Sequence, residues 1–123
     1  MTTGEDRNIR FLNNRYTVFD PRTLDGGIDG VELDLGCGSG GFALELARRY
    51  PERVILASDV MIGRLRKVEK SRSKAGLENL DVLRANNLEL VGSQLPESCI
   101  KRLHILCPDP WPKKRHRGRR LIS

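Results

Sequence analysis

Short apolar stretches alternate with amphipathic ones through the last three quarters of the chain. Strands are predicted for VELDL (31–35), RVILASDV (53–60), LDVLRAN (80–86) and IKRLHILC (100–107). The second of these stretches is almost entirely apolar, which is typical of a parallel strand covered on both faces of its sheet. The pattern therefore predicts a parallel sheet of buried strands.

Two segments between these strands have the spacing of amphipathic helices. FALELARRY (42–50) places its apolar side chains on one helical face, and Pro51 ends that helix; the face comprises Phe42, Ala43, Leu46, Ala47 and Tyr50. Residues 62–75 turn Ile62, Leu65 and Val68 inward and the basic residues outward, and Gly76 is a good helix stop. LELVGSQL, after the third strand, is compatible with a further short helix. Strand–helix alternation with short connections predicts an α/β fold with a doubly wound, mainly parallel sheet.

The first thirty residues lack this pattern. They are polar and carry turn signals at Asp20-Pro21 and at Asp25-Gly26-Gly27, while RFLNNRYTVF (10–19) suits either a short strand or an arm folded over the domain. We therefore expect an N-terminal arm over residues 1–30 and one domain over residues 31–123. A chain of 123 residues is long enough for one modest core.

The charge of the chain indicates what kind of partner it binds. The formal net charge is +6 and the isoelectric point is near 9.7, which favours a polyanionic partner such as nucleic acid over a merely soluble basic surface. The basic residues are unevenly distributed, with six in residues 64–74 and six more in residues 113–120. Three cysteines without CxxC spacing indicate neither a zinc site nor a disulfide framework. Because the sequence also lacks a membrane-length apolar run and a signal-peptide core, we expect a cytoplasmic protein.

The first predicted strand leads into the glycine-rich loop GCGSGG (36–41). Gly36, Gly38 and Gly41 have the dinucleotide spacing G-x-G-x-x-G, whereas Gly36, Gly38 and Gly40 have the tighter spacing G-x-G-x-G. In both templates the missing side chains let the backbone approach a ligand at the start of a helix. A purely structural strand-to-helix turn is the alternative interpretation.

Acidic and amide side chains at the strand ends favour one type of ligand. Asp34, two residues before the loop, would repel a pyrophosphate but would pair with an ammonium group. Asp59, at the end of the second strand, is the expected partner for ribose hydroxyls. Asn86 and Asn87, after the third strand, suit either contacts to adenine or a simple turn. Together these residues favour S-adenosylmethionine over NAD. Cys37, inside the loop, is interpreted as a small space-filler, because no positioned histidine base accompanies it.

The fourth predicted strand runs into PDPWPKKRHRGRR. Pro108 and Pro110 hold Asp109 in an extended conformation, and Trp111 offers a flat face for a nucleobase. The basic residues that follow are expected to bind phosphates; they are Lys113, Lys114, Arg115, Arg117, Arg119 and Arg120. A proline-stiffened turn followed by a solvated charge run is the alternative.

VELDLGCGSG, ASDV, RANN and above all PDPWPKKRHRGRRLIS closely resemble the bacterial tRNA (guanine-N7-)-methyltransferases. The resemblance covers residues 31–123 and implies a Rossmann-like enzyme that uses S-adenosyl-L-methionine and acts on tRNA. It places Asp34, Gly36, Asp59 and Asn86 at cofactor-binding positions, to which the loop pattern adds Gly38 and Gly40. Asp109 matches the catalytic aspartate and Lys113 a substrate-binding lysine, and we expect Trp111, Arg115 and Arg117 to contact substrate. Asp34 and Asp59 often correspond to glutamates in the family, and Asn86 often corresponds to an aspartate.

The family's sheet continues beyond the point where this sequence ends. We therefore expect residues 31–123 to be the N-terminal part of the methyltransferase domain, truncated after the fourth predicted strand. The apolar segment HILC would then form a sheet edge, which a second copy of the chain or a missing C-terminal segment would cover. A non-catalytic RNA-binding fragment and, less favoured, an NAD-dependent oxidoreductase remain the alternatives.

Overall fold

The computed structural model describes residues 8–14, 16–28, 30–96 and 98–105. Five strands form one sheet in the order β1-β4-β3-β2-β5, and every neighbouring pair is parallel. The strands are β1 (Ile9–Phe11), β2 (Val31–Leu35), β3 (Ile55–Asp59), β4 (Leu80–Arg84) and β5 (Ile100–His104). The sheet confirms the doubly wound, mainly parallel fold that the sequence pattern predicts.

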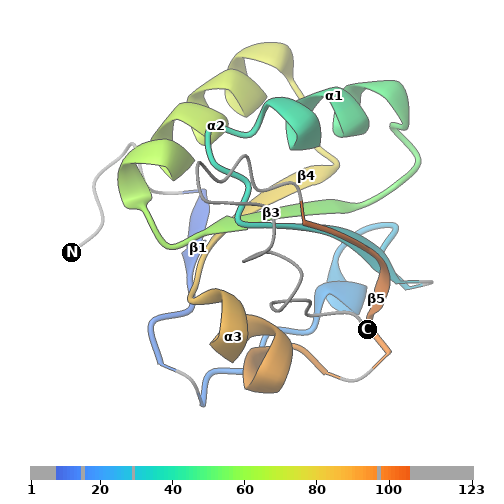
Figure 1. Cartoon of the computed structure of the whole chain (residues 1–123). Coiled ribbons are helices and arrows are strands. Elements are labelled where there is room, and N and C mark those ends of the chain that lie inside the picture. The colour runs from blue at the N-terminus through green and yellow to red at the C-terminus, as the bar shows by residue number, and fades with distance from the viewer. Residues whose placement is uncertain (1–7, 15, 29, 97, 106–123) are drawn as a thin grey trace, which may run out of the picture.

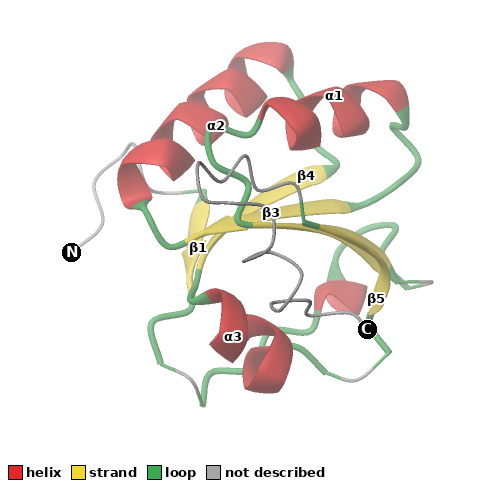
Figure 2. Cartoon of the chain, viewed as in Figure 1, coloured by secondary structure: helices red, strands yellow, loops and turns green. Residues whose placement is uncertain are grey.

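Helices cover both faces of this sheet. α1 (Gly41–Arg49) and α2 (Ile62–Ala75) lie side by side on one face, while α3 (Asn87–Glu89) lies on the other (Figures 1 and 2). α3 continues into the π-helical turn η3 (Leu90–Gln94), and the short 3-10 helix η2 (Pro21–Thr23) precedes β2. Chain order runs outward from β2 to β3 and β4, and then returns to place β5 on the other side of β2. The direction of winding therefore reverses between β2 and β5, where open α/β sheets bind their ligands.

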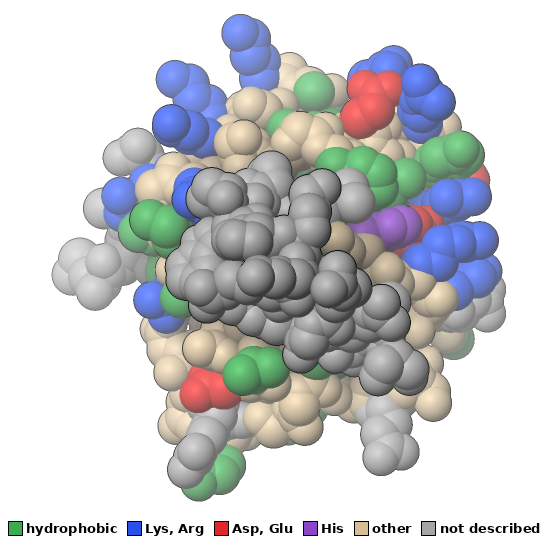
Figure 3. All heavy atoms as spheres, in the orientation of Figure 1, with side chains coloured by type: hydrophobic (Ala, Val, Ile, Leu, Met, Phe, Trp, Pro, Cys, Tyr) green, Lys and Arg blue, Asp and Glu red, His purple; other side chains and the backbone are tan. Residues whose placement is uncertain are grey.

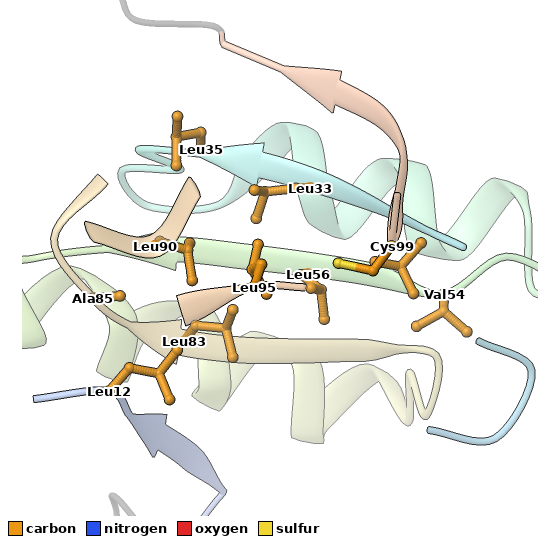
Figure 4. Packing of buried hydrophobic residues seen from close by; sticks show 11 residues of the cluster. Leu12, Leu33, Leu35, Val54, Leu56, Leu83, Ala85, Leu90, Leu95 and Cys99 are labelled. Atoms are coloured by element: carbon orange, nitrogen blue, oxygen red, sulfur yellow. The ribbon is translucent and has the colours of Figure 1, made fainter. Parts of the chain in front are cut away.

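Two apolar clusters hold the layers together. On the α1–α2 face, Ala43 and Ala47 of α1 and Leu65 and Val68 of α2 pack on buried residues of β1, β3 and β4. On the opposite face, leucines of β2, β3 and β4 pack beneath Leu90 and Leu95 (Figure 4). Nearly every strand position in β2 and β3 is buried, as the apolar runs predict.

The structure refines the predicted elements in three places. β1 pairs with β4 through Ile9 and Val82, so part of the expected N-terminal arm is a fifth strand. Phe42 is 37% exposed and does not join the buried face of its helix, which Ala43 and Ala47 provide instead. α2 spans the expected residues and ends at Gly76, whose φ of 68° is the left-handed conformation that glycine favours.

Candidate functional site

The candidate site lies at the carboxyl ends of β2, β3 and β4, beside the point where the winding reverses. The register aligns Asp34 with Ala57, so Asp34 ends on the same face of the sheet as the α1–α2 layer. Asp59 closes β3, and the amide of Ala85, just after β4, donates a hydrogen bond to its carbonyl at 3.1 Å. The residues that follow these three strands are thereby brought to one edge.

The glycine loop between β2 and α1 has a backbone that only glycine adopts easily. Gly36, Gly38 and Gly40 have φ values of 71°, 62° and 84°. The amide of Cys37 donates to the carbonyl of Ser58 at 2.8 Å, which ties the loop to β3. Because these three glycines have the left-handed backbone and Gly41 is already the first residue of α1, the loop follows the tighter G-x-G-x-G template.

Gly40 and Gly38 serve different purposes in this loop. A Cβ on Gly40 would lie 2.5 Å from Cγ2 of Val68, so the missing side chain allows α1 and α2 to approach closely. A Cβ on Gly38 would meet no atom within 4 Å. Gly38 therefore borders open space at the mouth of the loop, where a ligand has room to lie.

Asp59 is held firmly by the loop and by the start of α2. Its Oδ2 accepts a hydrogen bond from the amide of Gly38 and its Oδ1 accepts one from the amide of Met61, both at 2.9 Å. Nη1 of Arg64 lies 3.7 Å from Oδ2 and partly balances the charge. The carboxylate is thus oriented toward the loop before any ligand arrives.

Asp34 is in a less favourable environment for a charge. It is 2% exposed, and burial raises the pKa of its carboxyl to about 6. The negative charge of Asp59 raises this pKa further, and the nearby His104 acts in the opposite direction. At neutral pH a carboxyl with this pKa is mostly ionised, although burial disfavours its charge, so a positively charged group bound beside it would be stabilising.

Cys37 is not an available nucleophile. Burial raises the pKa of its thiol to about 12, with further contributions from the charges of Asp34 and Asp59. The thiolate required for nucleophilic attack or metal binding is therefore scarce at neutral pH. This agrees with its interpretation as a space-filling residue.

Asn86 begins the helix that follows β4. Its Oδ1 accepts hydrogen bonds from the amides of Leu88 and Glu89 at 3.0 and 3.2 Å, which caps α3. Asn86 is exposed and Asn87 is half-buried, next to the strand end that bonds to Asp59. The capping bonds leave the Nδ2 group of Asn86 and the side chain of Asn87 to meet a ligand.

The second half of the predicted site lies outside the described residues. This applies to the predicted catalytic residue Asp109 and to the predicted substrate contacts Trp111, Lys113, Arg115 and Arg117. Their roles remain predictions from the sequence.

Sequence reasoning missed an ion-pair cluster beside the site. Glu32 of β2 is 2% exposed and contacts one imidazole and two guanidinium groups: Nε2 of His104 at 3.0 Å, Nη1 of Arg53 at 3.3 Å and Nη1 of Arg102 at 3.4 Å. The ring of His104 also meets Phe42 edge to face, with 5.0 Å between centroids. The available signal was the charged residue within the apolar strand VELDL. The cluster ties β5 to β2 at the reversal of winding.

The described residues contain neither a metal-binding cluster nor a membrane-spanning helix. No group of three or more His, Cys, Asp or Glu side chains there is arranged to hold a metal ion. Within the same residues, none of the helices has the length and apolar character that a bilayer crossing requires.

The fold and the loop define a Rossmann-like α/β protein with a glycine loop between β2 and α1. A family model described as "Putative methyltransferase" matches residues 29–123. The chain belongs to this methyltransferase family.

Curated relatives match the whole length of this chain. The sequence is 40% identical over 129 residues to the tRNA (guanine-N(7)-)-methyltransferase of Neisseria meningitidis serogroup C. It is 34% identical over 130 residues to the enzyme of that name from Halorhodospira halophila. These matches confirm the resemblance drawn from the sequence motifs. Each covers 100% of this chain but only 54% and 56% of the relatives, so the chain spans about half their length.

A solved structure gives the same assignment of the fold. The 16S rRNA methyltransferase KamB is 32% identical, with a TM-score of 0.55 over 71% of this chain and 40% of KamB. The likeness supports a methyltransferase fold for this chain.

Proposed function

We propose that this chain is the cofactor-binding part of an enzyme that transfers a methyl group from S-adenosylmethionine to N7 of a guanine in tRNA. The observation that carries the proposal is a buried carboxyl, Asp34, beside an open glycine loop and the oriented carboxylate of Asp59. Membership of a methyltransferase family and the names of its curated relatives support the reaction and the substrate.

The charges around the loop fit a cationic cofactor better than a dinucleotide. A pyrophosphate at the loop would face the carboxylates of Asp34 and Asp59. These two groups already repel each other, since the charge of Asp59 raises the pKa of Asp34. An amino-acid ammonium group would relieve that repulsion by pairing with Asp34. Asp59 would accept hydrogen bonds from ribose hydroxyls, and Asn86 and Asn87 would meet the adenine. When bound, S-adenosylmethionine supplies an electrophilic methyl group on a cationic sulfur.

Methylation of guanine N7 requires little acid–base catalysis from the protein. Guanine N7 has a lone pair and no proton, so a strong general base is unnecessary and the main task is to hold the reacting atoms in line. In this proposal Asp109 accepts hydrogen bonds from guanine N–H groups and favours the positive charge that develops on the ring. Trp111, Lys113, Arg115 and Arg117 hold the RNA beside it.

The proposal extends to cellular context and assembly. A tRNA substrate implies that the enzyme acts in the cytoplasm. β5 has β2 as its only strand neighbour within the described residues, so a second copy of the chain is proposed to pair along that edge.

Radiolabelled methyl transfer to bulk tRNA, followed by strand cleavage at N7-methylguanine, tests the proposal. We expect incorporation and cleavage with the native chain, and loss of both in Asp109→Ala with cofactor affinity unchanged within a few fold. Full activity in Asp109→Ala would remove the catalytic assignment. Isothermal titration that detected NAD but not S-adenosylmethionine would favour an oxidoreductase, and tRNA binding without transfer would indicate an RNA-binding fragment.

A further inference from the structure

The outward face of α2 carries a stripe of positive charge. At 100° per residue, Arg66, Lys67, Lys70 and Lys74 fall within an arc of about 100°, opposite the buried Leu65 and Val68. All four basic side chains are exposed. Their positions span about 12 Å of helix axis at 1.5 Å per residue, and the axial distance between successive members stays below the Debye length of about 8 Å at physiological salt. They therefore act on a ligand as one surface, here called the α2 basic stripe.

No acidic residue of α2 pairs with the three lysines of this stripe. Glu69 is the only acid in the helix, and it is turned inward, with 6% of its surface exposed. Both of its oxygens accept hydrogen bonds of 2.7 Å from Arg72, which is itself half-buried. The charge of Glu69 is thus balanced on the inner face. Lys67, Lys70 and Lys74 have no ion pair with a described residue.

The neighbouring helix shows the opposite arrangement. In α1, Glu45 forms ion pairs with both Arg48 and Arg49 at 2.6 and 2.9 Å. In Figure 3, acidic and basic side chains lie together over α1, whereas basic side chains alone project over α2. The two adjacent helices thus differ: both arginines at the end of α1 share the carboxylate of Glu45, whereas Lys67, Lys70 and Lys74 of α2 have no ion pair with a described residue. This contrast separates the α2 basic stripe from the general basic character of the protein.

The stripe begins at the candidate site. α2 starts three residues after Asp59, and Arg64 in its first turn lies 3.7 Å from that carboxylate. Arg66 and Lys67 follow within the next turn, so the positive surface runs from the carboxyl edge of the sheet along the length of the helix. A polyanion that reaches the site would pass over it.

We propose that the α2 basic stripe binds the phosphate backbone of the RNA substrate outside the catalytic edge. Lysine ammonium groups on an exposed helix suit phosphates, because they contact the backbone without reading bases. The stripe adds affinity and orientation, and the choice of guanine is left to the carboxyl edge. The identity of the RNA as tRNA rests on the proposed function; the phosphate-binding role of the helix does not.

The test compares two double variants that remove the same number of positive charges. One is Lys70→Gln with Lys74→Gln on α2, and the matched control is Arg48→Gln with Arg49→Gln on α1. Both pairs are exposed, and glutamine preserves helix propensity. Fluorescence anisotropy with labelled tRNA is measured for each from about 50 to 200 mM salt, and a thermal melt confirms that each is folded.

We expect the α2 variant to bind tRNA about tenfold more weakly near 0.1 M salt. The slope of log affinity against log salt should become shallower by about 1 to 2, as two lost phosphate contacts predict. The α1 variant should change affinity less than twofold. Equal losses in the two variants, or no loss in the α2 variant, would overturn the proposal. Cofactor titration and methyl transfer with the native chain are measured separately, so their failure would refute the proposed reaction without affecting the comparison.

Discussion

Asp34 illustrates how a single buried group can determine the ligand of a loop. The side chain is nearly inaccessible, its pKa is raised to about 6, and the closest charge that opposes ionisation is Asp59. A cation bound beside it would reverse the effect of burial. The glycine loop alone permits many ligands, but this carboxyl selects against negatively charged ones.

Replacing Asp34 by Asn is expected to stabilise the ligand-free protein at neutral pH. The folded pKa lies above the unfolded value of about 3.9, so the native protein loses stability as pH rises from about 4 to about 6. Asn mimics the protonated form and avoids that loss. We expect the free energy of unfolding at pH 7.5 to rise by roughly 1–3 kcal/mol, measured by urea denaturation.

The same variant should differ little from the native protein at pH 4, where both side chains are neutral. Affinity for S-adenosylmethionine should fall more than tenfold in Asp34→Asn, and in the native protein it should fall as pH drops below about 6. A variant less stable than the native protein at pH 7.5 would contradict this account.

Gly40 is the loop position most sensitive to substitution. Gly40→Ala adds a Cβ 2.5 Å from the stiff, branched side chain of Val68, at a φ of 84°. We expect a loss of about 2–4 kcal/mol in the free energy of unfolding, from backbone strain plus overpacking. Gly38→Ala, at a φ of 62° with no neighbour within 4 Å, should lose only about 1–2 kcal/mol. Equal losses at the two positions would refute the packing role, and Val68→Ala should partly restore Gly40→Ala.

Among the elements, β5 depends most on a polar contact. Its burial is incomplete, and Glu32 of β2 binds both Arg102 and His104 on it. The carboxylate also binds Arg53, which precedes β3. One buried charge thus joins β5 to the rest of the sheet beside the reversal of winding.

Glu32→Ala should therefore loosen β5 selectively. Its partners are partly exposed and can be rehydrated, so we expect a loss of roughly 1–3 kcal/mol rather than the larger loss of a fully buried pair. Amide hydrogen exchange should accelerate in β5 more than in β3. Uniform acceleration across both strands would argue against a local role for this cluster.

At the level of the molecule, we expect the β5 edge of the sheet to govern how copies of the chain associate. Lys101 and Arg102 are both exposed on β5, and like charges on two approaching edges repel. We expect pairing of two copies through β5 to strengthen as salt screens this repulsion. Analytical sedimentation between 0.05 and about 0.5 M salt measures it. A compact monomer at every salt and protein concentration would exclude the dimer.

Local sequence patterns were sufficient to predict most of the helices and strands and many residues of the candidate site. The apolar runs predicted β2 and β3 closely, because strands buried on both faces leave little freedom in residue choice, and they also located β4 and β5. For β1 the pattern left a short strand and an arm both open, because its three residues become a strand only by pairing with β4. Asp34, Asp59 and the glycines were found because strand ends in a parallel sheet meet at one edge.

Side-chain environments required the folded structure. The sequence alone established a doubly wound α/β chain of the methyltransferase type with a glycine loop flanked by acids. It could not show that Asp34 is buried enough to raise its pKa, or that Glu32 gathers cations from two other segments. Nor could it show that Glu69 turns inward while the lysines of α2 face outward with no ion pair among the described residues. These properties depend on contacts between residues far apart in the chain, which only the packing of the sheet and its helices brings together.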